Sequence, residues 1–253
     1  MRIVLKFGSG ILASVKGNTL DRRQFSRLCR DVAWLVGQGH ECIVVSSGAV
    51  AAGLASLGLK QRPEDLALRQ ACAAVGQSKL MALYAECFSQ HGLEVAQLLL
   101  THGDIDSRTR FENVRGTLCR LLERGNVVPI INENDSVATE ELRFGDNDRL
   151  SAEVAILAGA DELLLLTSVE GLLDAKGNRL PVVLDVAKVM GLARVDKGRL
   201  SVGGMISKLQ AVKLAIDHGV LTIIGSGRKA GQIAAIVAGR DAGTRFLVGE
   251  KKR

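Results

Sequence analysis

Two short stretches concentrate acid and amide side chains to a degree that an ordinary turn does not need. Asn132 to Asp135 (Asn-Glu-Asn-Asp) follows the apolar run Val127 to Ile131, and Gly145 to Asp148 (Gly-Asp-Asn-Asp) lies a few positions further on. Together these clusters could hold an α-amino group, a metal-bound phosphate or an active-site lysine. The alternative for the second cluster is that its acids cap the helix expected over residues 151–158.

Two lysines lie where a charge would need compensation. Lys6 interrupts the apolar run Ile3 to Phe7, and a lysine in a buried strand is costly unless an anion meets it. Lys208 lies one helical turn after two glycines, which can form a cradle of N–H groups for phosphate. The alternatives are that the ammonium group of Lys6 reaches the surface, and that Lys208 is an exposed lysine on a flexible loop.

Small residues follow two of the expected strands. The Gly-Ser-Gly turn at residues 8–10 permits a close approach of backbone to phosphate. The Ser-Ser-Gly turn at 46–48 leads into a small-residue helix whose N-terminus suits a carboxylate or phosphate, although a serine cap without a ligand is the alternative. Residues 8–13 also match the dinucleotide fingerprint G-x-G-x-x-A. We reject that match because the polar stretch 14–21 separates these glycines from the next expected helix, and the sequence has no Walker-type loop.

Two lysines from distant parts of the chain, with Asp148 between them in the sequence and glycine-rich turns nearby, indicate phosphoryl transfer. That chemistry needs positioning and neutralised charge rather than a covalent nucleophile.

Apolar segments of strand length alternate with longer segments of helical period. Continuous apolar strands are typical of a sheet covered on both faces, and their alternation with helices predicts a largely parallel sheet in an α/β fold. Ligands then bind beyond the carboxyl ends of the strands, where the polar turns lie. One domain is the simplest interpretation, with a weak division into two lobes near residue 150. Strands are expected at residues 3–7, 42–45, 95–100, 127–131, 162–167, 221–224 and 246–248, and helices at 22–36, 49–58, 66–88, 108–123, 151–158, 205–218 and 232–238.

Composition narrows the class of protein. The 253 residues carry 33 Lys plus Arg and 27 Asp plus Glu, and this net charge of +6 suits anionic small substrates but is too small to indicate a nucleic-acid partner. Five cysteines without a C-x-x-C pair indicate neither a disulfide framework nor a zinc site. No stretch reaches the roughly 18 apolar residues of a membrane span, and no signal peptide is apparent. We therefore expect a cytoplasmic protein with no nucleic-acid and no membrane partner.

Six strings of the sequence match one family of kinases: Val4 to Ser9, Val45 to Gly53, Ala74 to Ser78, Pro129 to Asp135, Phe144 to Asp148 and Gly203 to Met205. On these strings the chain resembles the glutamate 5-kinases of the amino acid kinase family over nearly its whole length. The Asn-Glu-Asn-Asp and Gly-Asp-Asn-Asp strings separate this branch from the acetylglutamate, aspartate, carbamate and uridylate kinases. The resemblance implies a three-layer α/β/α sandwich with a largely parallel central sheet, the amino acid kinase (carbamate kinase-like) fold.

The resemblance also implies a reaction and its partners. ATP would phosphorylate the γ-carboxylate of L-glutamate, the first step of L-proline biosynthesis, with Mg²⁺ bridging the ATP phosphates. Glutamate would bind in an N-terminal lobe of about residues 1–150 and the nucleotide in a C-terminal lobe of about 151–253. A homo-oligomer (dimer or tetramer), feedback inhibition by proline and functional coupling to glutamate-5-semialdehyde dehydrogenase are expected. The chain would be the short form, without the C-terminal RNA-modification-type (PUA) domain.

Roles for single residues follow from the same resemblance. Lys6 and Lys208 would neutralise the phosphates being transferred, and Asp148 would orient both lysines. No protein side chain is expected to bind a metal. The expected glutamate contacts are Ser47, Gly48, Asn134, Asp135, Asp146 and Asn147. The expected nucleotide contacts are Lys6, Gly8, Ser9, Thr167, Ser168, Val202, Gly203, Gly204, Met205, Ile206, Ser207 and Lys208.

Two positions depart from the family pattern, and both lie on the nucleotide side. Ser168 stands where the family usually has aspartate, and Val202 where it usually has threonine. These changes leave nucleotide preference open and motivate one alternative, a non-catalytic amino-acid sensor, which the retained lysines argue against. Another alternative is a sister kinase with a different acceptor, which the strings at 132–135 and 146–148 argue against.

Overall fold

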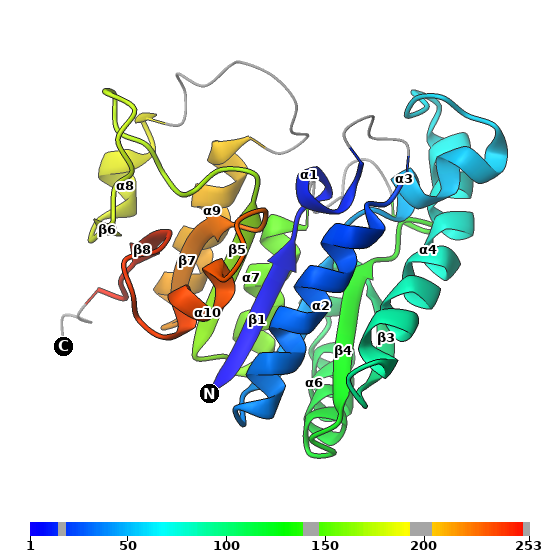
Figure 1. Cartoon of the computed structure of the whole chain (residues 1–253), viewed down its shortest axis with the longest axis horizontal. Coiled ribbons are helices and arrows are strands. Elements are labelled where there is room, and N and C mark those ends of the chain that lie inside the picture. The colour runs from blue at the N-terminus through cyan, green and yellow to red at the C-terminus, as the bar shows by residue number, and fades with distance from the viewer. Residues whose placement is uncertain (15–18, 139–146, 193–203, 250–253) are drawn as a thin grey trace.

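The computed structural model describes residues 1–14, 19–138, 147–192 and 204–249. Within these residues the strands form one eight-stranded sheet in the order β3-β4-β2-β1-β5-β7-β8-β6 (Figure 1). Every neighbouring pair is parallel except β7 with β8, which confirms the predicted largely parallel α/β sheet. The strands are β1 (Arg2–Phe7), β2 (Glu41–Ser46), β3 (Glu94–Leu100), β4 (Val127–Glu133), β5 (Glu162–Thr167), β6 (Val182–Val183), β7 (Leu221–Ser226) and β8 (Thr244–Phe246).

Helices cover both faces of the sheet and make the expected three layers. One layer, which includes α2 and α10 in front of the sheet in Figure 1, packs on one apolar cluster, and the layer containing α7 packs on the other. The first layer holds α2 (Arg22–Gly37), α4 (Leu66–Ser89) and α10 (Gln232–Val237), and the second α6 (Arg108–Leu122), α7 (Asp148–Ala158) and α9 (Met205–Asp217). Shorter helices are α1 (Ser9–Leu12), α3 (Ala49–Leu54), α5 (His102–Asp106) and α8 (Val186–Val189), with a 3₁₀ turn at Ala55–Leu57.

Capping residues fix where the two long helices of the first layer begin. Asp21 accepts a hydrogen bond from the Gln24 amide at 3.1 Å, as its sequence position predicts, and Asp65 accepts one from the Leu68 amide at 2.7 Å. Each cap satisfies an N–H group that has no partner inside the helix. The apolar stripe of α2 recurs every three or four residues and packs on the sheet through Phe25, Leu28, Cys29, Val32 and Leu35.

The alternation of side chains along β1 decides where Lys6 points. Ile3, Leu5 and Phe7 belong to the apolar cluster under α2, whereas Val4 belongs to the cluster under α7 and α9. Successive side chains of a strand point to opposite faces, so Lys6 shares the face of Val4. The central strand thus aims the buried Lys6 side chain at the layer of α7 and α9.

Four details differ from the sequence-based expectations. The single-turn helix α1 opens directly after β1, so our ground for rejecting the dinucleotide fingerprint was wrong, although the helix that needs a cap at Asp21 comes later, as expected. Strand β4 continues through Glu133, so Asn132 lies inside the strand rather than after it. Helix α7 begins at Asp148 rather than at Ser151, and the last strand ends at Phe246. Element ends are set by single hydrogen bonds, which hydrophobic periodicity does not report.

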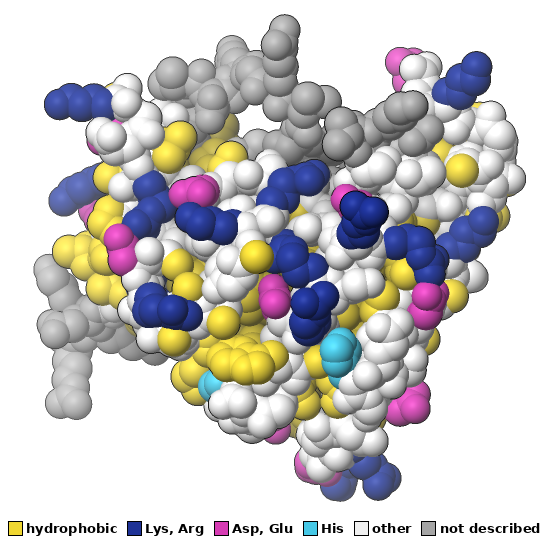
Figure 2. Space-filling model, viewed as in Figure 1, with side chains coloured by type: hydrophobic (Ala, Val, Ile, Leu, Met, Phe, Trp, Pro, Cys, Tyr) yellow, Lys and Arg dark blue, Asp and Glu magenta, His cyan; other side chains and the backbone are white. Residues whose placement is uncertain are grey.

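The surface carries dispersed charge. Figure 2 shows Lys and Arg side chains spread over the viewed face, several of them near acidic side chains. One exposed pair, Arg22 with Glu86, joins α2 to α4 at 2.6 Å. Among the described residues, no helix has both the length and the apolar character needed to cross a bilayer.

Candidate active site

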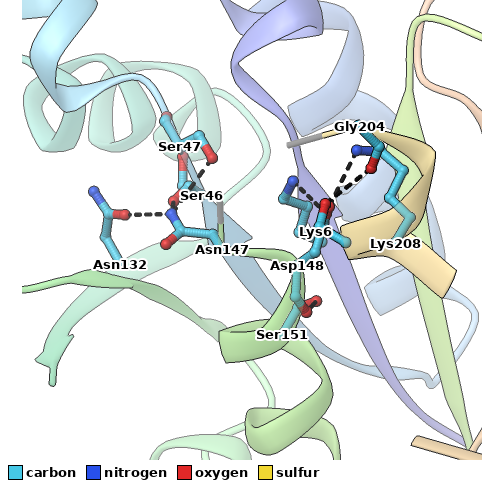
Figure 3. Close-up of polar contacts among 10 residues, drawn as sticks. Lys6, Ser46, Ser47, Asn132, Asn147, Asp148, Ser151, Gly204 and Lys208 are labelled. Carbon is cyan, nitrogen blue, oxygen red and sulfur yellow. Dashed lines mark hydrogen bonds and ion pairs between the residues drawn. The ribbon is translucent and has the colours of Figure 1, made fainter. Parts of the chain in front are cut away.

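A buried aspartate lies between two lysines at the carboxyl edge of the sheet. Asp148 Oδ1 accepts a hydrogen bond from Lys6 Nζ at 2.6 Å, and Asp148 Oδ2 accepts one from Lys208 Nζ at 3.1 Å (Figure 3). The side chain of Asp148 is 1% exposed and that of Lys6 is 2% exposed. The alternatives of a surface-reaching Lys6 and an exposed Lys208 are therefore wrong, because both side chains are buried.

Three elements from distant parts of the chain meet at this carboxylate. Lys6 comes from β1, Asp148 is the first residue of α7, and Lys208 lies in the first turn of α9. Ser207 Oγ lies 3.1 Å from Asp148 Oδ2 and 2.9 Å from the Gly204 carbonyl, so its single proton can serve either acceptor. The positive end of the α7 helix dipole also stabilises the negative charge of Asp148, which lies in the first turn of that helix.

The electrostatics of the cluster favour binding an anion. Burial by itself would raise the pKa of Asp148, but the ammonium groups of Lys6 and Lys208 outweigh burial and hold that pKa below its usual value. Asp148 therefore stays ionised at neutral pH. Asp148 thus holds two ammonium groups close together in a place from which water is largely excluded. Ammonium groups held in this way can bind a phosphate or carboxylate of a ligand.

Asn147 adopts a left-handed backbone conformation, with φ of 57°, directly before Asp148. Asparagine is one of the few residues that tolerate this conformation. Its side chain does not cap α7, but donates through Nδ2 to the Ser46 carbonyl at 2.6 Å and to Asn132 Oδ1 at 2.7 Å, with Ser47 Oγ at 3.4 Å. The capping alternative therefore fails for Asn147 and Asp148, whose side chains have other partners.

The two consecutive residues divide the site into two halves. In Figure 3, Asn147 faces the side-chain amide of Asn132, the main-chain carbonyl of Ser46 and the hydroxyl of Ser47, while Asp148 faces the two lysines. The start of α7 thus holds a neutral, hydrogen-bonding half beside a cationic half. Such a pair of neighbouring environments can bind a polar organic molecule next to a phosphorylated one.

The turn at residues 46–48 depends on close packing between α3 and α4. Gly48 precedes α3 with a φ of 104°, a conformation that side chains rarely adopt. A Cβ atom on Gly76 of α4 would lie 1.8 Å from the Ala49 carbonyl oxygen, and one on Gly53 of α3 would lie 2.0 Å from the Cys72 carbonyl oxygen. Only glycine lets these backbones approach so closely, and their contact fixes the Ser47 turn relative to α4.

The remaining expected residues lie at the same edge but make fewer contacts with the cluster. Gly8 follows β1 and donates to the Leu166 carbonyl at 3.3 Å, and the Thr167 carbonyl accepts from Gly227 at 2.8 Å, so the ends of β1, β5 and β7 are joined. Asn134 and Asp135 follow β4 and are half-buried, Ser9 and Ser168 are exposed, and Gly204 precedes α9, which Met205 and Ile206 begin. Three expected residues, Asp146, Val202 and Gly203, lie outside the described residues.

Asn132 and Gln77 are contact residues to which the sequence analysis assigned no role. Both lie in strings that match the family, but a pattern match does not say which side chains of a string point toward the site. The strand register was the missing information, because Asn132 lies inside β4 and shares hydrogen bonds with both Asn147 and Gln77.

The described residues contain no cluster of three or more His, Cys, Asp and Glu side chains that could hold a metal ion. A cavity of about 340 Å³ lies elsewhere, between α8 and α9, where Leu184, Asp185, Lys213 and Leu247 are among its lining residues. None of the expected site residues lines that cavity.

Comparison with known proteins agrees with this geometry. The family model described as "Amino acid kinase family" matches residues 1–226. The chain belongs to the amino acid kinase family. Within this family the chain is similar to curated glutamate 5-kinases: it is 46% identical to that of Myxococcus xanthus, over 97% of this chain and 66% of the relative, and 45% identical to that of Moorella thermoacetica, over 99% and 68%. The chain thus spans about two thirds of the length of these relatives.

Solved structures support the fold of this amino acid kinase. The crystal structure of UMP kinase from Bacillus anthracis matches with a TM-score of 0.65 at 18% identity, covering 97% of this chain and 95% of that one. At this identity the likeness concerns the fold alone. The family and the fold predicted from the six sequence strings are both confirmed.

Proposed function

We propose that this amino acid kinase transfers the γ-phosphoryl group of ATP to the γ-carboxylate of L-glutamate, giving L-glutamate 5-phosphate and ADP. The reaction would be the first step of L-proline biosynthesis. The observation that carries the proposal is Asp148 holding Lys6 and Lys208 together, in a chain 44–46% identical to curated glutamate 5-kinases. Use of ATP follows from the kinase family, and the acceptor follows from these relatives.

The two lysines reduce the electrostatic repulsion between the reactants, which is the main physical obstacle to this reaction. The attacking carboxylate and the γ-phosphate are both anionic, so they repel each other until positive charge screens them. Lys6 and Lys208 supply that charge, and because the surrounding protein is preorganised, little rearrangement is needed when the phosphate moves. Mg²⁺ would enter as part of the MgATP substrate.

Asp148 serves as a positioning group rather than a base. The attacking carboxylate carries no proton at neutral pH, so the transfer needs no proton acceptor. The lowered pKa of Asp148 keeps it ionised between the lysines, which aims both ammonium groups at one place. Ser151 Oγ donates to the Asp148 main-chain carbonyl at 2.6 Å and helps to fix this first residue of α7.

We assign glutamate to the half of the site that Asn147 faces. Ser47 and Gly48 would donate to its α-carboxylate, while Asn147 and Asp135 would bind its α-amino group, with Asn134 and Asp146 nearby. The γ-carboxylate would then point along α7 toward the lysines. This assignment agrees with the proposed division into two lobes at about residue 150, in which the N-terminal lobe would hold glutamate and the C-terminal lobe the nucleotide.

The nucleotide is assigned to the cationic half. Gly8 and Ser9 at the start of α1, Thr167 and Ser168 at the end of β5, and the N-terminal turn of α9 from Gly204 to Lys208 all lie at this edge. Exposed N–H groups at a helix N-terminus suit phosphate. Val202 and Gly203 are predicted to belong to the same loop.

Several predictions of the resemblance remain predictions for this chain. They are a dimeric or tetrameric assembly, inhibition by proline, coupling to glutamate-5-semialdehyde dehydrogenase and a cytoplasmic location.

A hydroxylamine trapping assay tests the proposed function. Acyl phosphates react with hydroxylamine to give hydroxamates, which form coloured complexes with added Fe³⁺. Purified protein with MgATP should therefore form hydroxamate and ADP only when L-glutamate is added. L-aspartate and N-acetyl-L-glutamate serve as matched acceptors, because each changes one recognised group or the chain length. Turnover of either of them without turnover of L-glutamate would show that the acceptor is wrong, and no turnover with any acceptor would favour a sensor.

A further inference from the structure

Gln77 belongs to the string Ala74 to Ser78, which matches the family but has no role in the reaction proposed above. On α4, Gln77 Oε1 accepts a hydrogen bond from Asn132 Nδ2 at 2.9 Å, and Gln77 Nε2 donates to Gln97 Oε1 at 3.3 Å. Asn132 Oδ1 in turn accepts from Asn147 Nδ2 at 2.7 Å. The side chain of Asn132 therefore connects Gln77 to Asn147.

Main-chain groups at two points show which atom of each amide in this chain of contacts is the oxygen and which is the nitrogen. The Glu133 N–H can only donate, so the Asn132 atom that it meets at 2.9 Å is Oδ1, which turns Asn132 Nδ2 toward Gln77. The atom of Gln77 that faces Asn132 must then be its oxygen. At the other end the Ser46 carbonyl can only accept, so Asn147 presents Nδ2 to it and, with its second N–H, to Asn132.

The result is a fixed direction for the Asn147 amide. An amide has two N–H bonds, and those of Asn147 are directed at the Ser46 carbonyl and at Asn132 Oδ1. The oxygen of Asn147 therefore has a fixed direction too, which binding of a substrate ammonium group requires. The side chain of Asn132 is 3% exposed, so without Gln77 its N–H group would lose a partner in a place that water reaches poorly.

The backbone that carries Gln77 is itself fixed. The neighbouring Gly76 packs against the Ala49 carbonyl so closely that any side chain there would collide with it. This contact ties the position of Gln77 to the turn that bears Ser47. The glycine contact thus connects α4 to the turn of Ser47, and the amide chain connects the next residue of α4 to Asn147.

We propose that Gln77 is a positioning residue of the amino-acid half of the site, which acts by orienting Asn132 and, through it, Asn147. The proposal rests on the function proposed above. Gln77 makes its contribution to ground-state binding of the amino acid, because Asp148 and the lysines are held by separate contacts. Loss of the acceptor at position 77 therefore raises KM for L-glutamate by about tenfold and changes kcat by less than about twofold.

The test compares four proteins in the hydroxamate assay at saturating MgATP: wild type, Gln77→Met, Gln77→Glu and Gln97→Met. Methionine keeps the length of Gln77 but removes the acceptor. Glutamate keeps the acceptor, and high salt screens its added charge. Gln97→Met is the matched control, because Gln97 is exposed and lies at the far end of the chain of contacts from Asn147. Thermal unfolding of each variant, without ligands, reports stability separately.

The proposal expects a raised KM for L-glutamate in Gln77→Met alone, with the KM for MgATP unchanged and Gln77→Glu restored to within about twofold of wild type. A merely structural role would lower the melting temperature and the active fraction while KM stays the same. That result, or an equal rise of KM in Gln77→Met and Gln77→Glu, overturns the role of Gln77 and leaves the proposed function intact. A wild-type protein without L-glutamate-dependent turnover refutes the proposed function itself, and the role of Gln77 with it.

Discussion

Replacing Asp148 with asparagine keeps the shape of the side chain and removes its negative charge from between the two lysines. Asp148 Oδ1 and Oδ2 each accept from one ammonium group, and the variant Asp148→Asn must present an NH₂ group to one of them. The side chains of Lys6 and Asp148 are 2% and 1% exposed, so solvent offers little compensation. Breaking a buried ion pair in this way costs about 3–5 kcal/mol of unfolding free energy. We expect the turnover of this variant to fall by about 100-fold as well.

The pH dependence of stability gives this prediction a second, independent readout. The pKa of Asp148 is depressed in the folded protein, so its contribution to stability is fully present above the unfolded value of about 3.9. That contribution is lost as the pH falls through the lower folded pKa. Urea unfolding at a series of pH values should therefore show the largest difference in unfolding free energy between wild type and Asp148→Asn near neutrality. This difference should become smaller only in acid, below about pH 4.

Two outcomes would refute this reasoning. A variant as stable as wild type to within about 1 kcal/mol at neutral pH would mean that the lysines do not need the carboxylate. A difference in unfolding free energy that stayed the same at acidic pH would mean that the substitution acts through packing rather than charge. Circular dichroism of the folded variant serves as the control that its secondary structure is unchanged.

Three further predictions concern single contacts of the site. Lys6→Met and Lys208→Met should each lower kcat by about 10²–10³-fold, because each removes one ammonium group from the phosphate site. Each variant should stay folded, as circular dichroism would show, because Asp148 keeps the other lysine as a partner. A wild-type rate in either variant would mean that the replaced lysine takes no part in the mechanism. Ser207→Ala should lower kcat by up to about tenfold, since one hydrogen bond to the carboxylate is lost, and an unchanged rate would mean that its proton serves only the Gly204 carbonyl. Gly76→Ala should destabilise the protein by about 1–3 kcal/mol in urea unfolding. The control Gly116→Ala, at an exposed position of α6 where a Cβ meets nothing, should not, and equal effects would contradict the packing argument.

The sequence predicted the parts of the site that rest on strand ends. Runs such as Leu163 to Leu166 are apolar throughout, so their burial on both faces and their parallel pairing were predictable, and with them the edge where ligands bind. Lys6 stood out because it alone interrupts a buried strand. The convergence of Lys6, Asp148 and Lys208 could be expected from the resemblance, and the structure places all three within hydrogen-bond distance.

The details that the sequence did not predict depend on register and on single hydrogen bonds. Hydrophobic periodicity does not show that β4 extends to Glu133, and therefore it does not show that Asn132 joins Asn147 to Gln77. The left-handed conformation of Asn147 is likewise set by tertiary contacts rather than by local preference. The short helix α1 was missed because four residues carry too little periodicity to predict a helix.

The central claim is that Lys6 and Lys208 bring the phosphate of ATP and the carboxylate of glutamate together under the direction of Asp148. A crystal structure with L-glutamate and a non-hydrolysable ATP analogue measures this most directly. We expect both ammonium groups within hydrogen-bond distance of the β- or γ-phosphate oxygens, Asp148 still between them, and the γ-carboxylate of glutamate facing the γ-phosphorus. Phosphates bound away from both lysines, with glutamate at another edge of the sheet, would contradict the account.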